Sequence, residues 1–265
     1  MSTSDLWIRD IVSYYGYILL GFLIISWLVA RRWRKFAENV YRSHLLGFET
    51  ECADLVAPYK KKLFEQLKYL ESNDEILRSL GRIRILEVGV KTGENIPFYP
   101  DGACFIGIDW NTKLADYLIN SERAWQFSHV YFERLIVGDG NSLRLIPSDC
   151  VDAVVSTRSL CSEDSVEKTL REIRRVLAPG GKYLFLEHVP DPTGGFVHKM
   201  QKFLTKSKIW PSLFGNCHLD MNPIEHINRA GFKDLVWKSL TLEGYVSQPN
   251  HLFLNRHHVI GTATR

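Results

Sequence analysis

The sequence predicts an α/β fold, in which a mostly parallel sheet of seven strands with an antiparallel last strand follows an N-terminal membrane helix. Strand-like and helix-like segments alternate from Arg82 onward, the pattern of a parallel sheet with crossover helices. Residues 83–93 form an apolar run followed by a glycine-bearing turn, and residues 105–109 form a second apolar run ending on a carboxylate. Because ligands of such sheets bind at the carboxyl ends of the strands, these two segments predict a nucleotide-sized pocket.

The composition bounds the class of protein. A chain of 265 residues with 45% hydrophobic residues buries one substantial core. The net charge of +3 gives no reason to expect a nucleic-acid partner. The five cysteines are scattered and lack CxxC spacing, so we predict no disulfide framework, no metal site and a reducing compartment. Nothing in the sequence indicates an obligate protein partner.

The N-terminal segment departs from a soluble profile. Residues 11–30 contain no charged side chain, and such a run spans a hydrocarbon core of roughly 30 Å as a helix. Tyrosines at 14, 15 and 17 and tryptophans at 27 and 33 resemble interfacial belts. Four basic residues follow at 31–35, against one at position 9, so the positive-inside rule places the rest of the chain in the cytosol. A buried core helix is the alternative, whereas no cleavage site supports a signal peptide.

We divide the chain into a membrane anchor (1–35), a helical lead-in (36–82) and a domain that contains the predicted sheet and its pocket (83–265). Within the lead-in, Pro58 is predicted to open a helix that runs to Leu70. The lysines at 60–62 have two interpretations. They form a solvated face, or they contact anionic lipid beside the anchor.

The elements of the sheet follow from short apolar runs and from turn residues. A helix over 164–177 is predicted from its amphipathic spacing, and it stops at the Ala-Pro-Gly-Gly of 178–181. A later helix over 222–230 ends at Gly231. The last two strands are predicted to pair as an antiparallel end of the sheet. The predicted strands lie at about 83–88, 104–109, 133–137, 151–156, 182–187, 233–241 and 257–263.

Two classes of cofactor share the strand–glycine–helix–strand–acid pattern, namely dinucleotides and S-adenosylmethionine (SAM). A dinucleotide site requires Gly-x-Gly-x-x-Gly, because a pyrophosphate sits on the helix N-terminus. Here the run is Glu87-x-Gly89-x-x-x-Gly93, so that pattern is missing. A glutamate directly before the loop suits a ligand that ends in an ammonium group, as the methionine of SAM does. The sequence therefore favours SAM over NAD.

Several short motifs then point to one family. They are Ile-Leu-Glu-Val-Gly at 85–89, Pro-Phe-Tyr-Pro at 97–100, Ile-Asp at 108–109, Ser-Leu-Cys-Ser at 159–162, the run ending Leu-x-Pro-Gly-Gly at 170–181, Glu-His-Val at 187–189, Phe-Gly-Asn-Cys at 214–217 and His-Val-Ile-Gly at 258–261. Together with the apolar N-terminus they resemble the membrane-anchored thiol S-methyltransferase branch of the methyltransferase-like proteins (methyltransferase-like protein seven). The resemblance implies a Rossmann-like class I methyltransferase of the endoplasmic reticulum or lipid droplets that acts on small alkyl thiols.

By this resemblance, the glycine loop holds the methionine end of SAM. Glu87 faces the ammonium, and the loop beneath it is formed by Gly89, Thr92 and Gly93. The family's loop usually reads Glu-x-Gly-x-Gly-Thr-Gly, and Lys91 replaces its middle glycine. If that position requires positive φ or close ligand approach, lysine costs affinity. If it only tolerates glycine, Lys91 points to solvent or toward the SAM carboxylate.

The resemblance also assigns the adenosine end. Asp109 holds the ribose hydroxyls, Trp110 stacks on the adenine, and Asp139 accepts the adenine amino group, with Gly140 giving room. The alternative to ligand binding is a purely structural role: Asp139 as a turn residue, and Asp109 as a helix N-cap or turn carboxylate.

The acceptor chemistry needs few protein groups. Methyl transfer from a sulfonium is an in-line displacement, so the main task of the enzyme is to position the reactants and to exclude water. A thiol is already a few per cent thiolate at neutral pH, so a base is not essential. His188 is the candidate base, and ordering of the strand end is its alternative role. Cys161 is predicted to be a pocket-wall residue and not a nucleophile.

The apolar, lysine-bearing region 190–221 is predicted to shape the acceptor pocket or to rest on the bilayer, and an ordinary helical cover for the sheet is the bland alternative. We therefore expect a membrane-anchored SAM-dependent methyltransferase with a small lipophilic acceptor, and a thiol by resemblance. Two alternatives stay open: a C- or O-methyltransferase for a quinone or lipid, and a non-catalytic scaffold whose SAM site has decayed.

Overall fold

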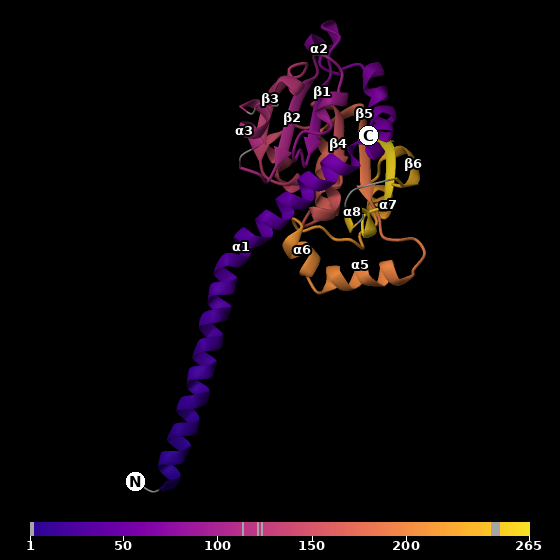
Figure 1. Cartoon of the computed structure of the whole chain (residues 1–265). Helices are drawn as coiled ribbons and strands as arrows, with labels where there is room; N and C mark the ends of the chain where they lie inside the picture. Colours follow the sequence, from indigo (N-terminus) through magenta and orange to yellow (C-terminus); the bar gives the residue numbers. More distant parts are fainter. Residues whose placement is uncertain (1–2, 113, 121, 123, 245–249) are drawn as a thin grey trace.

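A computed structural model describes residues 3–265, apart from residues 113, 121, 123 and 245–249. Seven strands form one sheet in the order β3-β2-β1-β4-β5-β7-β6 (Figure 1). All neighbouring pairs from β3 to β5 are parallel, whereas β7 runs antiparallel to both β5 and β6. This confirms the predicted fold class and the antiparallel end. The strands are β1 (Arg84–Val88), β2 (Cys104–Asp109), β3 (Tyr131–Val137), β4 (Val151–Thr157), β5 (Leu177–His188), β6 (Lys233–Thr241) and β7 (His257–Thr264).

The helices cover both faces of this sheet. The helix predicted over 164–177 is α4, and Ser165 caps it by accepting a hydrogen bond from the backbone N–H of Lys168. The helix predicted over 222–230 is α7, which begins on a proline directly after its Asn222 cap. The helices are α1 (Thr3–Glu65), α2 (Glu75–Ser79), α3 (Leu114–Ile119), α4 (Val166–Val176), α5 (Phe196–Lys206), α6 (Ile209–Leu213), α7 (Pro223–Arg229) and α8 (Asn250–Phe253).

Strand β5 is longer than the predicted 182–187. It begins at Leu177, directly after α4, and includes the Ala-Pro-Gly-Gly run. Leu177 pairs with Val151 while Lys182 pairs with Ala153, so the intervening residues form an irregularity in the ladder. Proline and glycine end the helix as expected, but extended backbone accommodates both of them.

Helix α1 corrects a second prediction. Pro58 lies inside this helix of 63 residues and does not open a new one. The residues on either side of it, Val56 and Phe64 among them, are buried against the sheet, and this packing outweighs the hydrogen bond lost at the proline. The helix also runs unbroken through residue 35, so the division of the chain into anchor, lead-in and catalytic domain stays a prediction.

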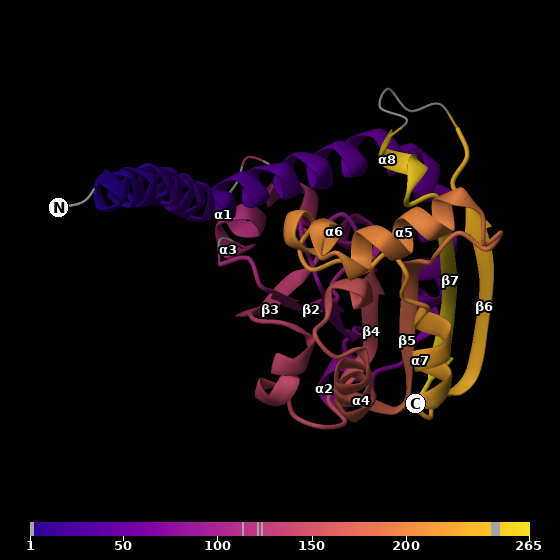
Figure 2. The same ribbon diagram turned by 90° about the horizontal axis from the view of Figure 1, so that it is seen from below.

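Two apolar layers enclose the sheet. On one face, α1 packs over Ile85 and Phe105. On the other face, α4 and α7 pack over Leu86 and Val154. Figure 2 shows α1 on one side of the strands and α4 and α7 on the other. The C-terminal part of α1 is therefore part of the same core as the strands.

The N-terminal half of α1 projects away from the sheet (Figure 1). Its segment Tyr14–Trp33 has 20 residues and a mean hydropathy of 1.5, and none of it is buried. By length and composition this segment is able to cross a membrane.

Candidate active site

A cavity of about 320 Å³ opens at the carboxyl ends of the strands, where the sequence places the pocket. Its walls are the segments that follow β1, β2, β3 and β4, together with one turn of α1 and the loop after α6. Five predicted cofactor residues line it: Gly89, Asp109, Trp110, Asp139 and Gly140. The remaining described residues of the lining are Tyr41, Lys91, Ile108, Gly138, Ser159, Ser162, Glu163, Asp164, Gly215 and Asn216.

Asp109 is the last residue of β2 and is only 4% exposed. One carboxylate oxygen accepts a hydrogen bond of 2.7 Å from the backbone N–H of Lys91, and the other accepts one of 2.8 Å from that of Asn111. The side chain thus orders the glycine loop and the turn after β2, while it also lines the cavity. The turn role and the placement for a ligand therefore coexist in one residue.

Lys91 adopts the left-handed conformation that its loop position reserves for glycine. Its φ is 54°, which costs a non-glycine residue about 1–2 kcal/mol. The side chain does not extend into solvent. Its Nζ donates hydrogen bonds of 2.9 Å to the backbone carbonyls of Thr157 and Arg158, at the end of β4. Burial lowers the pKa of this ammonium, and the nearby charge of Arg158 lowers it further.

Glu87 is fully buried beneath the loop, and it lies outside the described lining of the cavity. Its carboxylate accepts hydrogen bonds from Tyr99 Oη at 2.6 Å and from Asn95 Nδ2 at 2.7 Å. Burial raises its pKa to about 7, although both hydrogen bonds act in the opposite direction. Glu87 therefore changes charge near neutral pH.

The two loop glycines are required by protein packing. A Cβ on Gly89 (φ 77°) would lie 2.2 Å from Ser159 Oγ, and one on Gly93 (φ 77°) would lie 2.7 Å from Leu118 Cδ2. From the sequence we predicted that both glycines allow the backbone to approach a ligand closely. In the structure their neighbours are side chains of the same chain, and Gly93 and the buried Thr92 lie outside the described lining.

Tyr41 of α1 is a site residue that the sequence did not reveal. Its ring lies 5.6 Å from that of Trp110, at an interplanar angle of 44°, and it also packs on Gly215. Burial raises the pKa of Tyr41 above its ordinary value. No local motif marks this tyrosine, because it reaches the cavity only through the path of a helix that begins far outside the sheet.

Glu163 is a second residue missed from the sequence. It accepts a hydrogen bond of 3.0 Å from the backbone N–H of Gly140 and one of 2.9 Å from Thr169 Oγ1. Burial raises its pKa to about 7. Its position shortly after β4 is the signal that predicts it, because every segment at that edge of the sheet contributes to the cavity.

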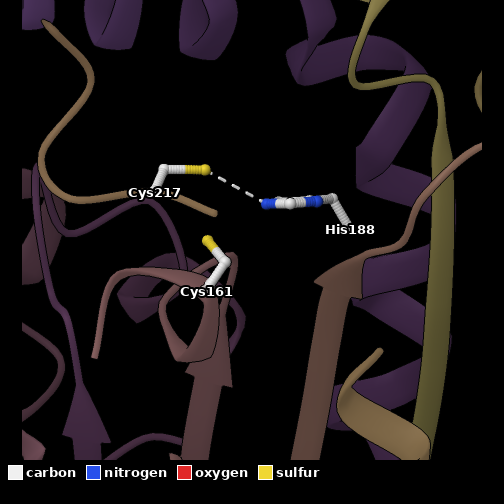
Figure 3. A group of neighbouring side chains, drawn as sticks. All are labelled: Cys161, His188 and Cys217. Atoms are coloured by element: carbon white, nitrogen blue, oxygen red, sulfur yellow. Dashed lines mark hydrogen bonds between the residues drawn. The ribbon is translucent and has the colours of Figure 1, made fainter. Parts of the chain in front are cut away.

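His188 ends β5 and is 3% exposed. Its Nε2 lies 3.2 Å from Cys217 Sγ, and Cys161 Sγ completes a compact group of three side chains (Figure 3). Hydrogen bonding between the two thiols lowers the pKa of Cys217 and raises that of Cys161. Cys217 is therefore the thiol that ionises first. The sequence predicted no such group, because its members are far apart along the chain.

The strand order and the loop-lined cavity are those of a class I SAM-dependent methyltransferase. Residues 86–185 match the family model described as a methyltransferase domain. Among solved structures, the [4+2]-cyclase SpnF is similar with a TM-score of 0.52 and 19% identity, covering 77% of this chain and 79% of the other. A possible histamine N-methyltransferase from Thermotoga maritima has a TM-score of 0.51 and 16% identity, covering 85% and 98%.

Curated relatives identify the branch. The human thiol S-methyltransferase TMT1A is 32% identical over 88% of this chain and 89% of its own length. The rat thiol S-methyltransferase TMT1B is 33% identical over 66% of this chain and 68% of its own length. The chain belongs to the thiol S-methyltransferase family, and the resemblance stated from its motifs is confirmed.

Proposed function

We propose that this protein is a membrane-anchored enzyme that transfers the methyl group of SAM to the sulfur of a small lipophilic thiol. The observation that carries the proposal is the 32% identity to human thiol S-methyltransferase TMT1A over 88% of the chain. The cavity at the carboxyl edge of the sheet supports it, since the segments after four parallel strands converge there.

The adenosine end of SAM occupies the wall formed after β2 and β3. Asp109 accepts hydrogen bonds from the ribose hydroxyls, and Trp110, which is 54% exposed, offers an aromatic face to the adenine. Asp139 accepts the adenine amino group. Gly140 continues this wall, and its lack of a side chain makes room for Thr169 and Glu163, which pack against it.

The methionine end lies over the loop of Gly89, Thr92 and Gly93. Glu87 stabilises the ammonium by its charge from below the loop, since both of its oxygens are already hydrogen-bonded. Lys91 opposes this arrangement, because its ammonium adds a second positive charge near that of SAM. Its Nζ is held by the backbone carbonyls of Thr157 and Arg158. SAM supplies the electrophilic methyl group, and the loop holds it in line with the acceptor.

The segment Tyr14–Trp33 anchors the enzyme in the membrane of the endoplasmic reticulum or of lipid droplets, with the sheet in the cytosol. A second contact with lipid is supported by α5. Its Phe196 and Phe203 are 74% and 64% exposed, and exposed lysines lie between and after them. Figure 1 shows α5 at the end of the domain toward which the free half of α1 projects.

The acceptor enters from this membrane side. The loop after α6 contributes Gly215 and Asn216 to the cavity, so the chain that follows the proposed lipid-contacting helix α5 forms a wall of the site. A lipophilic acceptor dissolved in the bilayer is thereby brought close to the strand ends. His188 is the proposed proton acceptor at this side of the site.

The test begins with calorimetric titration of SAM into the full-length protein in detergent. We expect micromolar binding, a loss of at least about tenfold in Asp109→Asn, and no loss in Asp101→Asn, a matched change at an exposed turn. Methyl transfer from labelled SAM is then compared for hexanethiol and hexanol. Transfer to hexanol and not to hexanethiol supports an O-methyltransferase, and absence of SAM binding by folded protein supports a decayed scaffold. Either result refutes the proposal.

A further inference from the structure

We propose that Cys161, Cys217 and His188 bind a zinc ion whose fourth coordination position takes the sulfur of the acceptor thiol. The inference rests on the proposed function, adds to it a metal and a means of activating the acceptor, and replaces the role of His188 as proton acceptor. The ligand atoms of the three residues lie within 4.8 Å of one another. Figure 3 shows both sulfur atoms and the imidazole edge directed toward one another.

Three different elements supply these ligands. Cys161 lies in the short helical turn at 160–162 after β4, His188 ends β5, and Cys217 follows α6. The backbone N–H of His218 donates to the carbonyl of Cys161 at 2.9 Å, and Asn216 Nδ2 donates to the carbonyl of Ser162 at 3.2 Å. These bonds hold the Cys217 loop against the Cys161 turn, so the thiols are preorganised by hydrogen bonds that do not involve the sulfurs.

The donor set suits zinc. Two thiolates and one imidazole form a three-ligand site of the kind that catalytic zinc uses, with one position left open. Zinc–sulfur bonds of about 2.3 Å place two sulfurs about 3.8 Å apart in a tetrahedron, which is within the spread of this group. His188 Nε2 and Cys217 Sγ, at 3.2 Å, need to separate by only a few tenths of an ångström.

We place the open position on the side of the cavity, whose described lining does not include the three ligands themselves. Ser162 and Asn216, the chain neighbours of Cys161 and Cys217, both line it. A ligand that enters beside them approaches the metal from the side on which the proposed SAM site lies. Burial of Cys161 and His188, each 3% exposed, shields the metal from bulk water on the other sides.

Methyl transfer at this site needs no reactant other than SAM and the acceptor thiol. Each cysteine releases its proton to solvent when zinc binds. The acceptor thiol then coordinates the zinc and also loses its proton to solvent, because coordination deprotonates a thiol outright. The thiolate sulfur forms a bond to the methyl carbon of SAM, and the carbon–sulfonium bond breaks with its electron pair going to the departing sulfur. The product is a neutral thioether, a weaker zinc ligand than a thiolate, so it leaves.

In this arrangement His188 acts as a metal ligand and is not needed as a base. The two roles are separable by experiment, because Cys217→Ser removes a zinc ligand and leaves the imidazole in place. Zinc activation predicts that this variant loses its activity toward hexanethiol by at least about tenfold. A histidine base predicts that the variant keeps it.

The decisive measurement uses the full-length protein purified in detergent without chelator. We expect about one zinc per chain by plasma mass spectrometry, and the same in Cys150→Ser, a matched change at a thiol that directly precedes β4, at the opposite end of that strand from Cys161. Cys161→Ser, Cys217→Ser and His188→Gln should reduce zinc to background. Calorimetry with SAM shows whether each variant keeps its cofactor site.

Replacement of zinc by cobalt tests the open position. We expect the intense visible bands of tetrahedral, thiolate-bound cobalt, and we expect hexanethiol, but not hexanol, to shift them. A wild-type protein that binds SAM but neither metal refutes the zinc site and leaves the proposed function intact. Cobalt bands that hexanethiol leaves unchanged refute the activating role. A protein that binds metal but no SAM refutes the proposed function instead.

Discussion

The buried carboxyl of Glu87 predicts a particular dependence of stability on pH. Burial raises its pKa from 4.5 to about 7, so the folded protein holds a proton on Glu87 between these values and the unfolded chain does not. Stability therefore falls as the pH rises from 4.5 to 7, and it changes no further from this source at higher pH. One pKa unit corresponds to about 1.4 kcal/mol, so the whole loss is about 3 kcal/mol.

The variant Glu87→Gln isolates this contribution. Glutamine keeps an acceptor for Asn95, and Tyr99 is able to rotate its hydroxyl to accept from the new amide. We expect its free energy of unfolding to fall by about 2.5 kcal/mol less than that of the wild type between pH 5 and 8. The difference between the two proteins is the quantity of interest, because Glu163 and Glu187 are also buried with raised pKa values and contribute equally to both.

Denaturant unfolding of the full chain, followed by tryptophan fluorescence at several pH values, measures this difference. Glu71→Gln, a change at an exposed carboxyl, provides the matched control and should parallel the wild type. If the curves of Glu87→Gln and wild type stay parallel within about 1 kcal/mol, Glu87 is ionised in the folded protein throughout this range. The burial argument is then wrong.

Three further substitutions test the site. Lys91→Gly removes a buried ammonium beside the proposed methionine end of SAM, so the dissociation constant of SAM should fall at least about tenfold by calorimetry; an unchanged value would mean that the loop binds SAM equally well with its lysine in place. Tyr41→Ala removes the ring against Trp110 and should weaken SAM binding about threefold to tenfold, whereas equal affinity would exclude α1 from the site. Gly89→Ala should cost about 2 kcal/mol in unfolding free energy, and adding Ser159→Gly should recover only part of it, since the φ of 77° remains; complete recovery would show that the clash alone matters.

Much of the fold was predictable because local patterns and global topology agree. The predicted strand positions match closely, apart from the early start of β5, since each apolar run can be buried only between two layers. Helix α1 shows the limit of local reasoning. Pro58 indicates a helix start in isolation, and only the packing of Val56 and Phe64 against the sheet shows why the helix continues through it.

The candidate site likewise contains residues that the sequence predicted and features that only the structure shows. Gly89 and Asp109 were predicted because strand ends of a parallel sheet meet at one edge, whereas Trp110, Asp139 and Gly140 were predicted from the family resemblance; all five line the cavity. The conformation of the Lys91 side chain was not predictable from the sequence, because a lysine can extend into solvent or bind backbone carbonyls. Only the tertiary structure shows that the carbonyls at the end of β4 lie beside it.

The sequence by itself determined the class of sheet, the apolar helix at the N-terminus and the family, because these depend on residue type and order. Only the tertiary structure decided that Tyr41 reaches the cavity and that Cys161, Cys217 and His188 form one group. Their positions are separated by 27 residues or more, so no local pattern relates them. The path of α1 over the sheet brings Tyr41 to the cavity, and the return of the chain after β5 brings Cys217 to Cys161 and His188. These paths are set by the burial of whole helices and strands and not by any motif.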